Sequence, residues 1–406
     1  MLREENEQTP ERKAAFDQAM AEARYYVENP DALRKEVDTW EKERDQTHLY
    51  APHPDQYAYR MMNYRGFVRF PERLWNFLIV KENLRDEHCI SLPVMMDIEP
   101  DSRCNFRCIM CARAKEGVKA KGSPRLKLED FKKFMDANPQ FVEVKVQGVG
   151  EPLLNPDIFD MISYAISRDT WVRTTVNGSL LHKNENYKRL IDSGIGEVQT
   201  SFDGTTKETF ERIRVGSDFD RIVANLKLMN DYAAKMDRDY TRMWVLLQNN
   251  NRSELLDFIT LAAKMGFRRL TYSVVLTGWG EEDCFDNLKT KAFSDEEEGK
   301  ILEKARKEGI DVSVWNCTDR FRVDSPETVC PVPFTRAFIA SDLRIIPCGT
   351  IGYSQDVNYG QALDFKKHWN SKIYRAFRRA HLTGNIPAFC RECYDLDNVP
   401  TKDSEG

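Results

Sequence analysis

Three closely spaced cysteines are the residues of this chain with the clearest chemical potential. They are Cys104, Cys108 and Cys111, separated by three and then two residues. Three thiolates on one loop can ligate three irons of a cubane iron–sulfur cluster, which leaves the fourth iron without a protein ligand. Such an open position suits a reactive metal centre. The alternatives are buried thiols or a zinc site, but zinc usually takes a fourth ligand and no histidine occurs between His88 and His182.

A second set of four cysteines lies in the last quarter of the chain. Cys330 and Cys348 precede a C-x-x-C pair formed by Cys390 and Cys393. Four thiolates could bind zinc or a cluster with complete ligation. A fully ligated cluster leaves no iron for substrate, so it would act as an electron carrier. The three remaining cysteines, Cys89, Cys284 and Cys317, are interpreted as small buried apolar residues, although Cys284 lies in a loop that could reach substrate.

Alternating strands and helices surround the first cysteine set. Short apolar strands separated by helical stretches predict βαβ units and a parallel sheet. Six strands are too few for a closed eight-stranded barrel, so we expect an α/β fold with a partial, open (β/α)6 barrel over residues 91–310. Ligands should bind at the carboxyl ends of its strands. The predicted strands are Val94–Glu99, Phe141–Gln147, Trp171–Val176, Glu197–Phe202, Met243–Gln248 and Leu270–Val275.

Two further regions flank the barrel. Residues 1–90 read as a charged helical extension, with Thr9–Pro10 and Asn29–Pro30 as helix-start signals. The alternation fades after about Glu308, and Ala337–Ile346 predicts a hairpin around Ser341–Asp342. We therefore expect a second, smaller domain over residues 311–406.

The overall composition restricts the function classes. The net charge is −5, from 60 basic and 65 acidic residues, so no electrostatic footprint for nucleic acid or a membrane surface is expected. No run of 18 apolar residues exists, and the first residues lack the apolar core of a secretory signal. We expect a cytoplasmic protein, in which thiols stay reduced and are available for metal ligation.

The cysteine loop also carries a family resemblance. CNFRCIMC, after DIEPDSR, resembles the signature loop of radical S-adenosylmethionine (SAM) enzymes. The resemblance implies a 4Fe–4S cluster on Cys104, Cys108 and Cys111, with the amino and carboxylate groups of SAM on the open iron. One electron then breaks the sulfonium bond and yields a 5′-deoxyadenosyl radical. A flavodoxin- or ferredoxin-type reductant is implied as a partner.

Motifs at the ends of successive strands extend the resemblance over roughly residues 93–280. The segment Gln147–Pro152 resembles the GGE motif that binds the methionine amino group, although Val149 splits the glycine pair. Taken alone, each motif could be an ordinary turn. The resemblance assigns the following positions to SAM: Gly148, Gly150 and Glu151 for the amino group, Asn177 near the ribose, Ser201 facing the ribose or the carboxylate, Arg214 or Arg221 for the carboxylate, and Gln248 near adenine.

The order of the C-terminal cysteines resembles the twitch domain, a shortened form of the SPASM domain. The resemblance implies one auxiliary 4Fe–4S cluster that removes a second electron from a substrate radical. The net reaction would oxidise a small polar alcohol, such as a sugar or aminocyclitol, and would need a base. Weak candidates for the base or for substrate contact are Tyr272, Arg336 and Cys284.

Two other functions remain open at this stage. The first is a peptide-modifying radical SAM maturase or epimerase. Such enzymes often carry a β-rich recognition domain at the N-terminus, whereas residues 1–90 read as helical. The second is a non-catalytic iron–sulfur or zinc protein, which would have no need of motifs at four strand ends.

Overall fold

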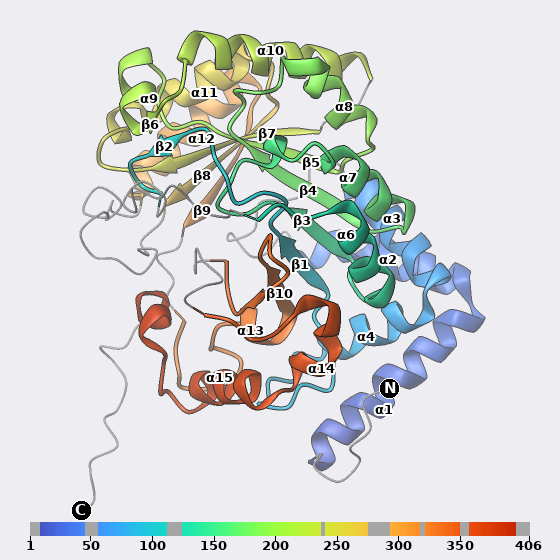
Figure 1. Ribbon diagram of the computed structural model, residues 1–406. Coiled ribbons are helices and arrows are strands. Elements are labelled where there is room, and N and C mark those ends of the chain that lie inside the picture. Colours follow the sequence, from blue (N-terminus) through green and yellow to red (C-terminus); the bar gives the residue numbers. More distant parts are fainter. Residues whose placement is uncertain are drawn as a thin grey trace, which may run out of the picture.

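The computed structural model describes residues 9–44, 56–111, 124–236, 240–274, 293–316, 321–349 and 357–394 (Figure 1). In this part of the chain, one sheet of nine strands has the order β11-β10-β1-β3-β4-β5-β7-β8-β9. All neighbouring strands are parallel except the hairpin pair β10 and β11. The strands are β1 (Met95–Ile98), β3 (Glu143–Val146), β4 (Trp171–Val176), β5 (Glu197–Ser201), β7 (Thr241–Leu247), β8 (Arg269–Val274), β9 (Asp311–Asn316), β10 (Arg336–Ile339) and β11 (Ile345–Ile346).

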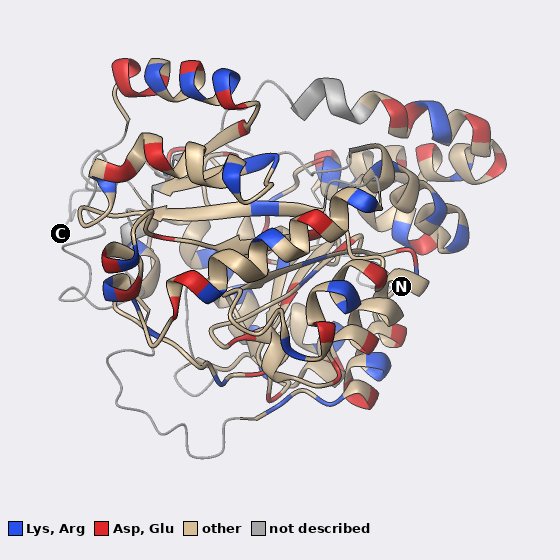
Figure 2. Ribbon diagram, turned by 90° about the horizontal axis from the view of Figure 1, so that it is seen from above, with Lys and Arg blue, Asp and Glu red and all other residues tan. Residues whose placement is uncertain are grey.

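Helices connect the strands and cover the outer face of the sheet (Figure 1). Basic and acidic residues are interspersed along these helices (Figure 2). The connecting helices are α6 (Leu128–Ala137), α7 (Ile158–Ser167), α8 (Asn186–Asp192), α9 (Lys207–Ile213), α10 (Phe219–Lys235), α11 (Leu255–Lys264) and α12 (Asp295–Glu308), with short 3₁₀ turns η1 (Pro152–Leu154), η2 (Lys183–Glu185) and η3 (Arg252–Glu254). The α/β fold class with a parallel sheet is thus confirmed.

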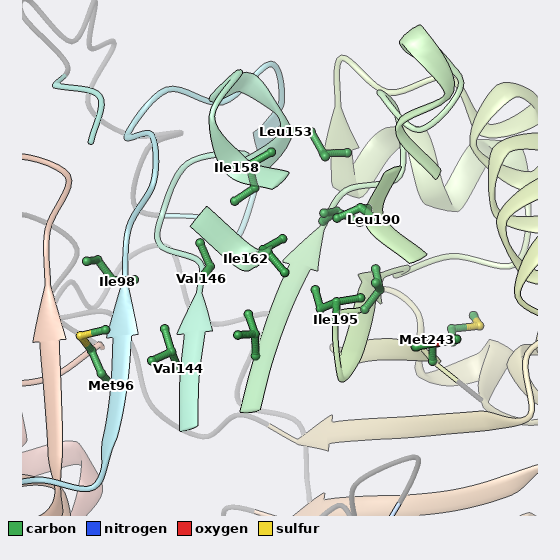
Figure 3. Close-up of a cluster of buried hydrophobic side chains, with 14 of the residues drawn as sticks. Met96, Ile98, Val144, Val146, Leu153, Ile158, Ile162, Leu190, Ile195 and Met243 are labelled. Carbon is green, nitrogen blue, oxygen red and sulfur yellow. The ribbon is translucent and has the colours of Figure 1, made fainter. Parts of the chain in front are cut away.

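The two faces of the sheet differ in chemistry because successive side chains of a strand point to opposite sides. One face is apolar and packs on the helices, as Val144 and Val146 do against Ile158 and Ile162 (Figure 3). The side chains of the other parity are polar in most of the strands. They include Asp97, Lys145, Arg173, Glu197, Gln199, Arg242 and Thr271. The inner face of the sheet is therefore charged, whereas its outer face packs on the helices to form an ordinary hydrophobic core.

Ion pairs hold this interior together across four strands. Arg173 on β4 pairs with Glu143 on β3 and with Glu197 on β5, the latter at 3.5 Å. Arg242 on β7 pairs with the same Glu197 and donates to the Thr271 hydroxyl at 3.0 Å. Glu197 is 1% exposed, so its carboxylate compensates two guanidinium groups that have little water around them.

The segment after residue 310 is joined to the barrel sheet. Its strand β9 pairs with β8, and β10 pairs with β1. The predicted hairpin is present as β10 and β11, and Leu343 in its turn has a left-handed φ of 63°. The rest of this segment is formed by α13 (Val332–Thr335), η5 (Ala362–Asp364), α14 (Phe365–Trp369), α15 (Lys372–Leu382) and η6 (Ala388–Cys393). The predicted domain boundary at residue 310 stays a prediction. The sheet continues across this position, since β9 and β10 pair with strands of the barrel.

Four helices precede the sheet: α1 (Pro10–Glu28), α2 (Pro30–Arg44), α3 (Gln56–Arg69) and α4 (Pro71–Lys81). Thr9 caps α1 by accepting from the backbone N–H of Arg12, as its sequence position predicts. The fully buried Arg73 of α4 donates to the carbonyls of Pro139 and Asp169, in the loops just before β3 and β4. The helices therefore cover the end of the sheet where its strands begin, and the carboxyl ends lie opposite. No helix in the described ranges is long and apolar enough to cross a membrane.

The first prediction concerns Glu197. Replacing it by Ala leaves Arg242 and Arg173 short of a buried counter-charge, so we expect the free energy of unfolding to fall by about 3–5 kcal/mol. Chemical denaturation followed by circular dichroism measures the change. The matched control is Glu129→Ala, which removes an exposed carboxylate 3.8 Å from Lys132 and should cost less than about 1 kcal/mol. Equal losses in the two variants would show that the interior network contributes no special stability.

Candidate active site

The three-cysteine loop leaves the carboxyl end of β1 and is anchored on both sides. The buried Asp101 carboxylate accepts from Arg103 at 2.6 Å and from Arg125 at 3.2 Å, which fixes the start of the loop. Cys108 lies in the short strand β2 (Arg107–Cys108), which pairs with β6 (Arg214–Val215). The backbone N–H of Cys111 donates to the Cys108 carbonyl at 3.0 Å, so the second and third cysteines share one turn.

A guanidinium group lies beside the loop. The Nη1 of Arg214 lies 4.0 Å from the Cys108 sulfur, and its Nη2 lies 2.6 Å from the Asp203 carboxylate. Burial raises the pKa of Cys108 to about 12, whereas Arg214 acts in the opposite direction. A thiolate must form before it can ligate iron. Arg214 therefore supplies charge compensation on the side of the loop where ligation would bring negative charge.

The donor set fits an iron–sulfur cluster better than a single ion. In the ranges that the structure describes, no group of three or more His, Cys, Asp or Glu side chains is placed to hold one metal ion. A cubane is larger and takes one thiolate per iron. Cys104, Cys108 and Cys111 are all half-exposed, and Cys104 and Cys111 lie close enough to Cys108 to influence its pKa. These three thiols are the residues that we predict to hold the cluster.

The glycine motif after β3 is shaped by its packing on β1. A Cβ atom on Gly148 would lie 2.3 Å from the Glu99 side chain, and one on Gly150 would lie 1.9 Å from the Asp101 carbonyl oxygen. The Glu99 carboxylate accepts from the backbone N–H groups of Val149 at 2.9 Å and Gly150 at 3.3 Å. The two glycines thus let the motif lie directly against the start of the cysteine loop.

Glu151 is buried and links two strand ends. Its carboxylate accepts from the backbone N–H of Asn177 at 2.9 Å and of Leu153 at 3.2 Å. Burial raises its pKa to about 7, although both N–H donors favour the charged form. Asn177 in turn donates to Asn105, which lies between Cys104 and Cys108. The predicted contacts to the methionine and ribose ends of SAM are therefore joined in one hydrogen-bonded chain.

Gln248 follows β7 and is fully buried, yet neither its amide oxygen nor its amide nitrogen has a partner in the described part of the chain. A buried amide without partners is costly, so a ligand group is its natural complement. Adenine, the group assigned to this position by the resemblance, offers both a donor and an acceptor. Ser201 is half-buried at the end of β5, on the face of the sheet that also carries Gln199.

The structure separates the two arginine candidates for the SAM carboxylate. Arg214 is buried beside the cysteine loop, as described above. Arg221 is exposed and pairs with Asp218 on its own helix α10. It lines a hollow of about 160 Å³ on the outside of the loop, together with Asn105, Phe106 and His182. Arg214 is therefore the better placed of the two.

The four C-terminal cysteines come together from segments up to 63 positions apart. The thiol of Cys390 is influenced by those of Cys348, Cys330 and Cys393, and burial is the main cause that raises its pKa. The backbone N–H of Cys330 donates to the Tyr394 hydroxyl at 2.8 Å, which also contacts His381 at 2.6 Å. The structure thus gathers these thiols at one place, beside the edge of the sheet.

The three weak candidates for base or substrate contact have different outcomes. Tyr272 is fully buried on the helix side of β8, and its hydroxyl donates to the Leu255 carbonyl. Burial also raises the pKa of Tyr272. Because the side chain lies on the helix side of the sheet, the structure does not bring Tyr272 to the site. Arg336 lies on the interior face, 3.8 Å from Asp97. Cys284 lies outside the described residues.

Sequence reasoning missed the polar residues of the barrel interior, above all Asp97, Lys145 and Trp244. Lys145 extends across the interior until its ammonium lies 5.9 Å from the centre of the Trp244 ring. Burial and, to a smaller extent, the neighbouring Arg173 lower the pKa of Lys145 to about 8. The signal was present in the alternation of β3, Glu-Val-Lys-Val, where the polar parity marks the inner face.

Comparison with known proteins agrees with this geometry. Residues 98–262 match the family model described as "Radical SAM superfamily". They run from β1 through the cysteine loop to α11, and so include the barrel elements that carry the predicted SAM contacts. Residues 98–262 thus form a radical SAM domain, the kind of domain that binds a 4Fe–4S cluster and SAM.

Individual proteins that are similar to this chain have low sequence identity to it. The AdoMet-dependent heme synthase of Methanosarcina barkeri is 24% identical over 314 residues, covering 70% of this chain and 85% of the relative. The mycofactocin maturase MftC of Mycobacterium ulcerans is 28% identical over 182 residues, and the match spans about half of that protein, 47%, and 44% of this chain. SuiB of Streptococcus suis, solved bound to S-adenosylmethionine, is similar in fold, with a TM-score of 0.55 at 17% identity over 85% of this chain and 78% of SuiB.

The second prediction tests the glycine motif. In Gly150→Ala the new methyl group would meet the backbone of Asp101, which has no rotamer to relieve the overlap. The start of the cysteine loop must shift, so we expect reconstituted protein to lose about four irons per chain. Iron analysis and visible absorbance measure the loss. Gly299→Ala is the control, because nothing lies within 4 Å of that position. Unchanged iron in Gly150→Ala would contradict the packing argument.

The third prediction concerns the pH dependence of stability. The pKa of Glu151 is about 7 in the fold against 4.5 for a free side chain, so between these values the folded state binds a proton that the unfolded state has released. Its contribution is fully present below pH 4.5 and is lost as the pH rises to 7, by up to roughly 3 kcal/mol.

Urea denaturation at a series of pH values tests this. Relative to the wild type, Glu151→Gln should become less destabilised as the pH rises through this window, whereas the exposed control Glu129→Gln should follow the wild type. Parallel curves for wild type and Glu151→Gln would mean that the carboxyl group titrates normally.

Proposed function

We propose that this chain is a radical SAM oxidoreductase that oxidises a small polar substrate of the sugar or aminocyclitol kind. The observation that supports this most is the proximity of four thiols to one another beside the β11 edge of the sheet, near the strand β1 that leads into the three-cysteine loop. These thiols are those of Cys330, Cys348, Cys390 and Cys393. When bound, the two clusters and SAM would supply a 5′-deoxyadenosyl radical to take a hydrogen atom and an auxiliary acceptor for the second electron.

The residues of the chain have separable tasks in this proposal. Cys104, Cys108 and Cys111 hold the first cluster, and Arg214 balances the charge beside it. Gly148, Gly150, Glu151, Asn177, Ser201 and Gln248 contact SAM at the strand ends. Four cysteines ligate the auxiliary cluster completely, so substrate binds to the polar interior of the barrel and not to that iron. A flavodoxin- or ferredoxin-type protein delivers the electron, in a cytoplasmic setting that keeps the thiols reduced.

A peptide-modifying maturase is the second candidate, and specific observations favour it. MftC carries the name maturase, and SuiB has also been solved bound to its precursor peptide SuiA, with a TM-score of 0.54. Against it, the N-terminal segment of this chain is helical in its described part and covers the strand beginnings. Affinity capture of a precursor peptide by the full chain would favour the maturase, and turnover of a free small molecule would favour the oxidoreductase.

The fourth prediction separates the two cysteine sets. After anaerobic reconstitution, the wild type should hold about eight irons per chain and form 5′-deoxyadenosine from SAM under strong reductant. The double variant Cys390→Ala/Cys393→Ala should hold about four irons and still form 5′-deoxyadenosine, but should give no oxidised product.

The complementary variant Cys104→Ala should also hold about four irons, and it should leave SAM intact. A wild-type count of about four irons would remove the auxiliary cluster from the proposal. Formation of 5′-deoxyadenosine by Cys104→Ala would refute the assignment of the first set.

A further inference from the structure

Lys145 projects from the middle of β3 into the interior of the barrel. The strand register places it between Asp97 on β1 and Arg173 on β4. It is half-buried, on the face of the sheet that the helices do not cover. Asp97 and Arg173, its register neighbours on the two adjacent strands, are both charged. The partners of the Lys145 ammonium therefore determine which charge a ligand in the interior should carry.

The other cations of the interior already have acceptors. Arg173 pairs with two glutamates, Arg242 pairs with Glu197, and Arg336 lies 3.8 Å from Asp97. The Lys145 ammonium makes no hydrogen bond or ion pair in the described part of the chain, and its recorded contact is the face of Trp244 at 5.9 Å. In the described part of the chain, Lys145 is thus a positive charge without a direct counter-ion, on the inner face of the sheet.

Leaving this charge unpaired has a cost. Removal of a cation from water is unfavourable unless an anion or acceptor replaces the water. Asp97 offsets part of this cost, but Arg173 and Arg336 both act against a positive charge at Lys145. A ligand carboxylate would relieve the imbalance, whereas a ligand ammonium would increase it.

We propose that Lys145 and Trp244 form the substrate subsite, and that the Lys145 ammonium binds the carboxylate of a hydroxy acid of the sugar-acid class. The Trp244 ring offers an apolar surface to the C–H face of such a ring, and the hydroxyl and amide of Thr175 and Gln199 lie on the same face of the sheet. The proposal rests on the proposed function and narrows its substrate class, since it disfavours cationic aminocyclitols.

The experiment compares three ligands with similar rings and different charge: glucuronate, glucose and glucosamine. Each is titrated calorimetrically into the full-length protein reconstituted with iron and SAM, and glycolate is added as the smallest hydroxy carboxylate. We expect glucuronate to bind at least 10-fold more tightly than glucose, and glucosamine to bind most weakly. Lys145→Met should reduce glucuronate to the affinity of glucose, and Lys145→Arg should retain part of the preference.

Controls keep the result specific to this subsite. Lys133→Met removes an exposed lysine of α6 and should leave all affinities unchanged. Iron content and thermal unfolding are measured on every variant, and Lys145→Gln replaces Lys145→Met if the latter does not fold. The proposal is overturned if the wild type shows no preference for either carboxylate, or if the preference survives in Lys145→Met. Formation of 5′-deoxyadenosine without ligand is assayed separately, so that failure of the radical SAM function is distinguished from failure of the subsite.

Discussion

The carboxylate of Glu99 is the interaction on which the arrangement of the site depends. One oxygen accepts from the backbone of the glycine motif after β3, and the other accepts from the Ser341 hydroxyl at 2.9 Å in the β10–β11 hairpin. Glu99 itself directly follows β1 and lies two residues before Asp101, whose carboxylate anchors the cysteine loop. A single side chain thus joins the three-cysteine loop, the glycine motif after β3 and the segment that carries the second cysteine set. Removing it would leave backbone N–H groups without acceptors on both sides.

Local sequence patterns predicted the fold well wherever a strand and its partner helix were adjacent in the chain. The six predicted barrel strands correspond to β1, β3, β4, β5, β7 and β8. The pairing of β1 with β10 was not predictable, because it joins Asp97 to Phe338 across more than half of the chain. Strand β9 was missed for a related reason. Its Asp-Val-Ser-Val pattern follows a helix whose charged sequence resembles a surface element, and nothing local indicates that β8 is its partner.

At the site, the sequence predicted which residues are present, but it did not predict the contacts that require those residue types. The resemblance assigned Gly148 and Gly150 to the methionine amino group, and the structure gives them a further role, because they make room for Glu99 and Asp101. Tyr272 was considered as a base because its strand ends near the barrel mouth. Its parity within Arg-Leu-Thr-Tyr-Ser-Val is that of Leu270, which is the apolar, helix-facing parity. Lys145 has the opposite parity in its own strand and therefore lies on the inner face. The position of a residue within its strand, and not its type, determines which of the two side chains reaches the interior.

The charged inner face of the sheet differs from the interior of a closed barrel. A closed core of this size would normally be filled by branched apolar side chains in layers. Here Glu143, Arg173, Glu197 and Arg242 fill part of the interior with paired charges, which are tolerable because each group is compensated. Lys145, in register with Arg173, has no such ion pair in the described part of the chain, and the Gln248 amide after β7 has no partner there either. Both groups lie on the inner side of the sheet, and Gln248 lies at the strand ends where parallel α/β sheets bind ligands. A nucleotide at Gln248 and a small anionic molecule at Lys145 would each supply a partner that the described part of the chain does not provide.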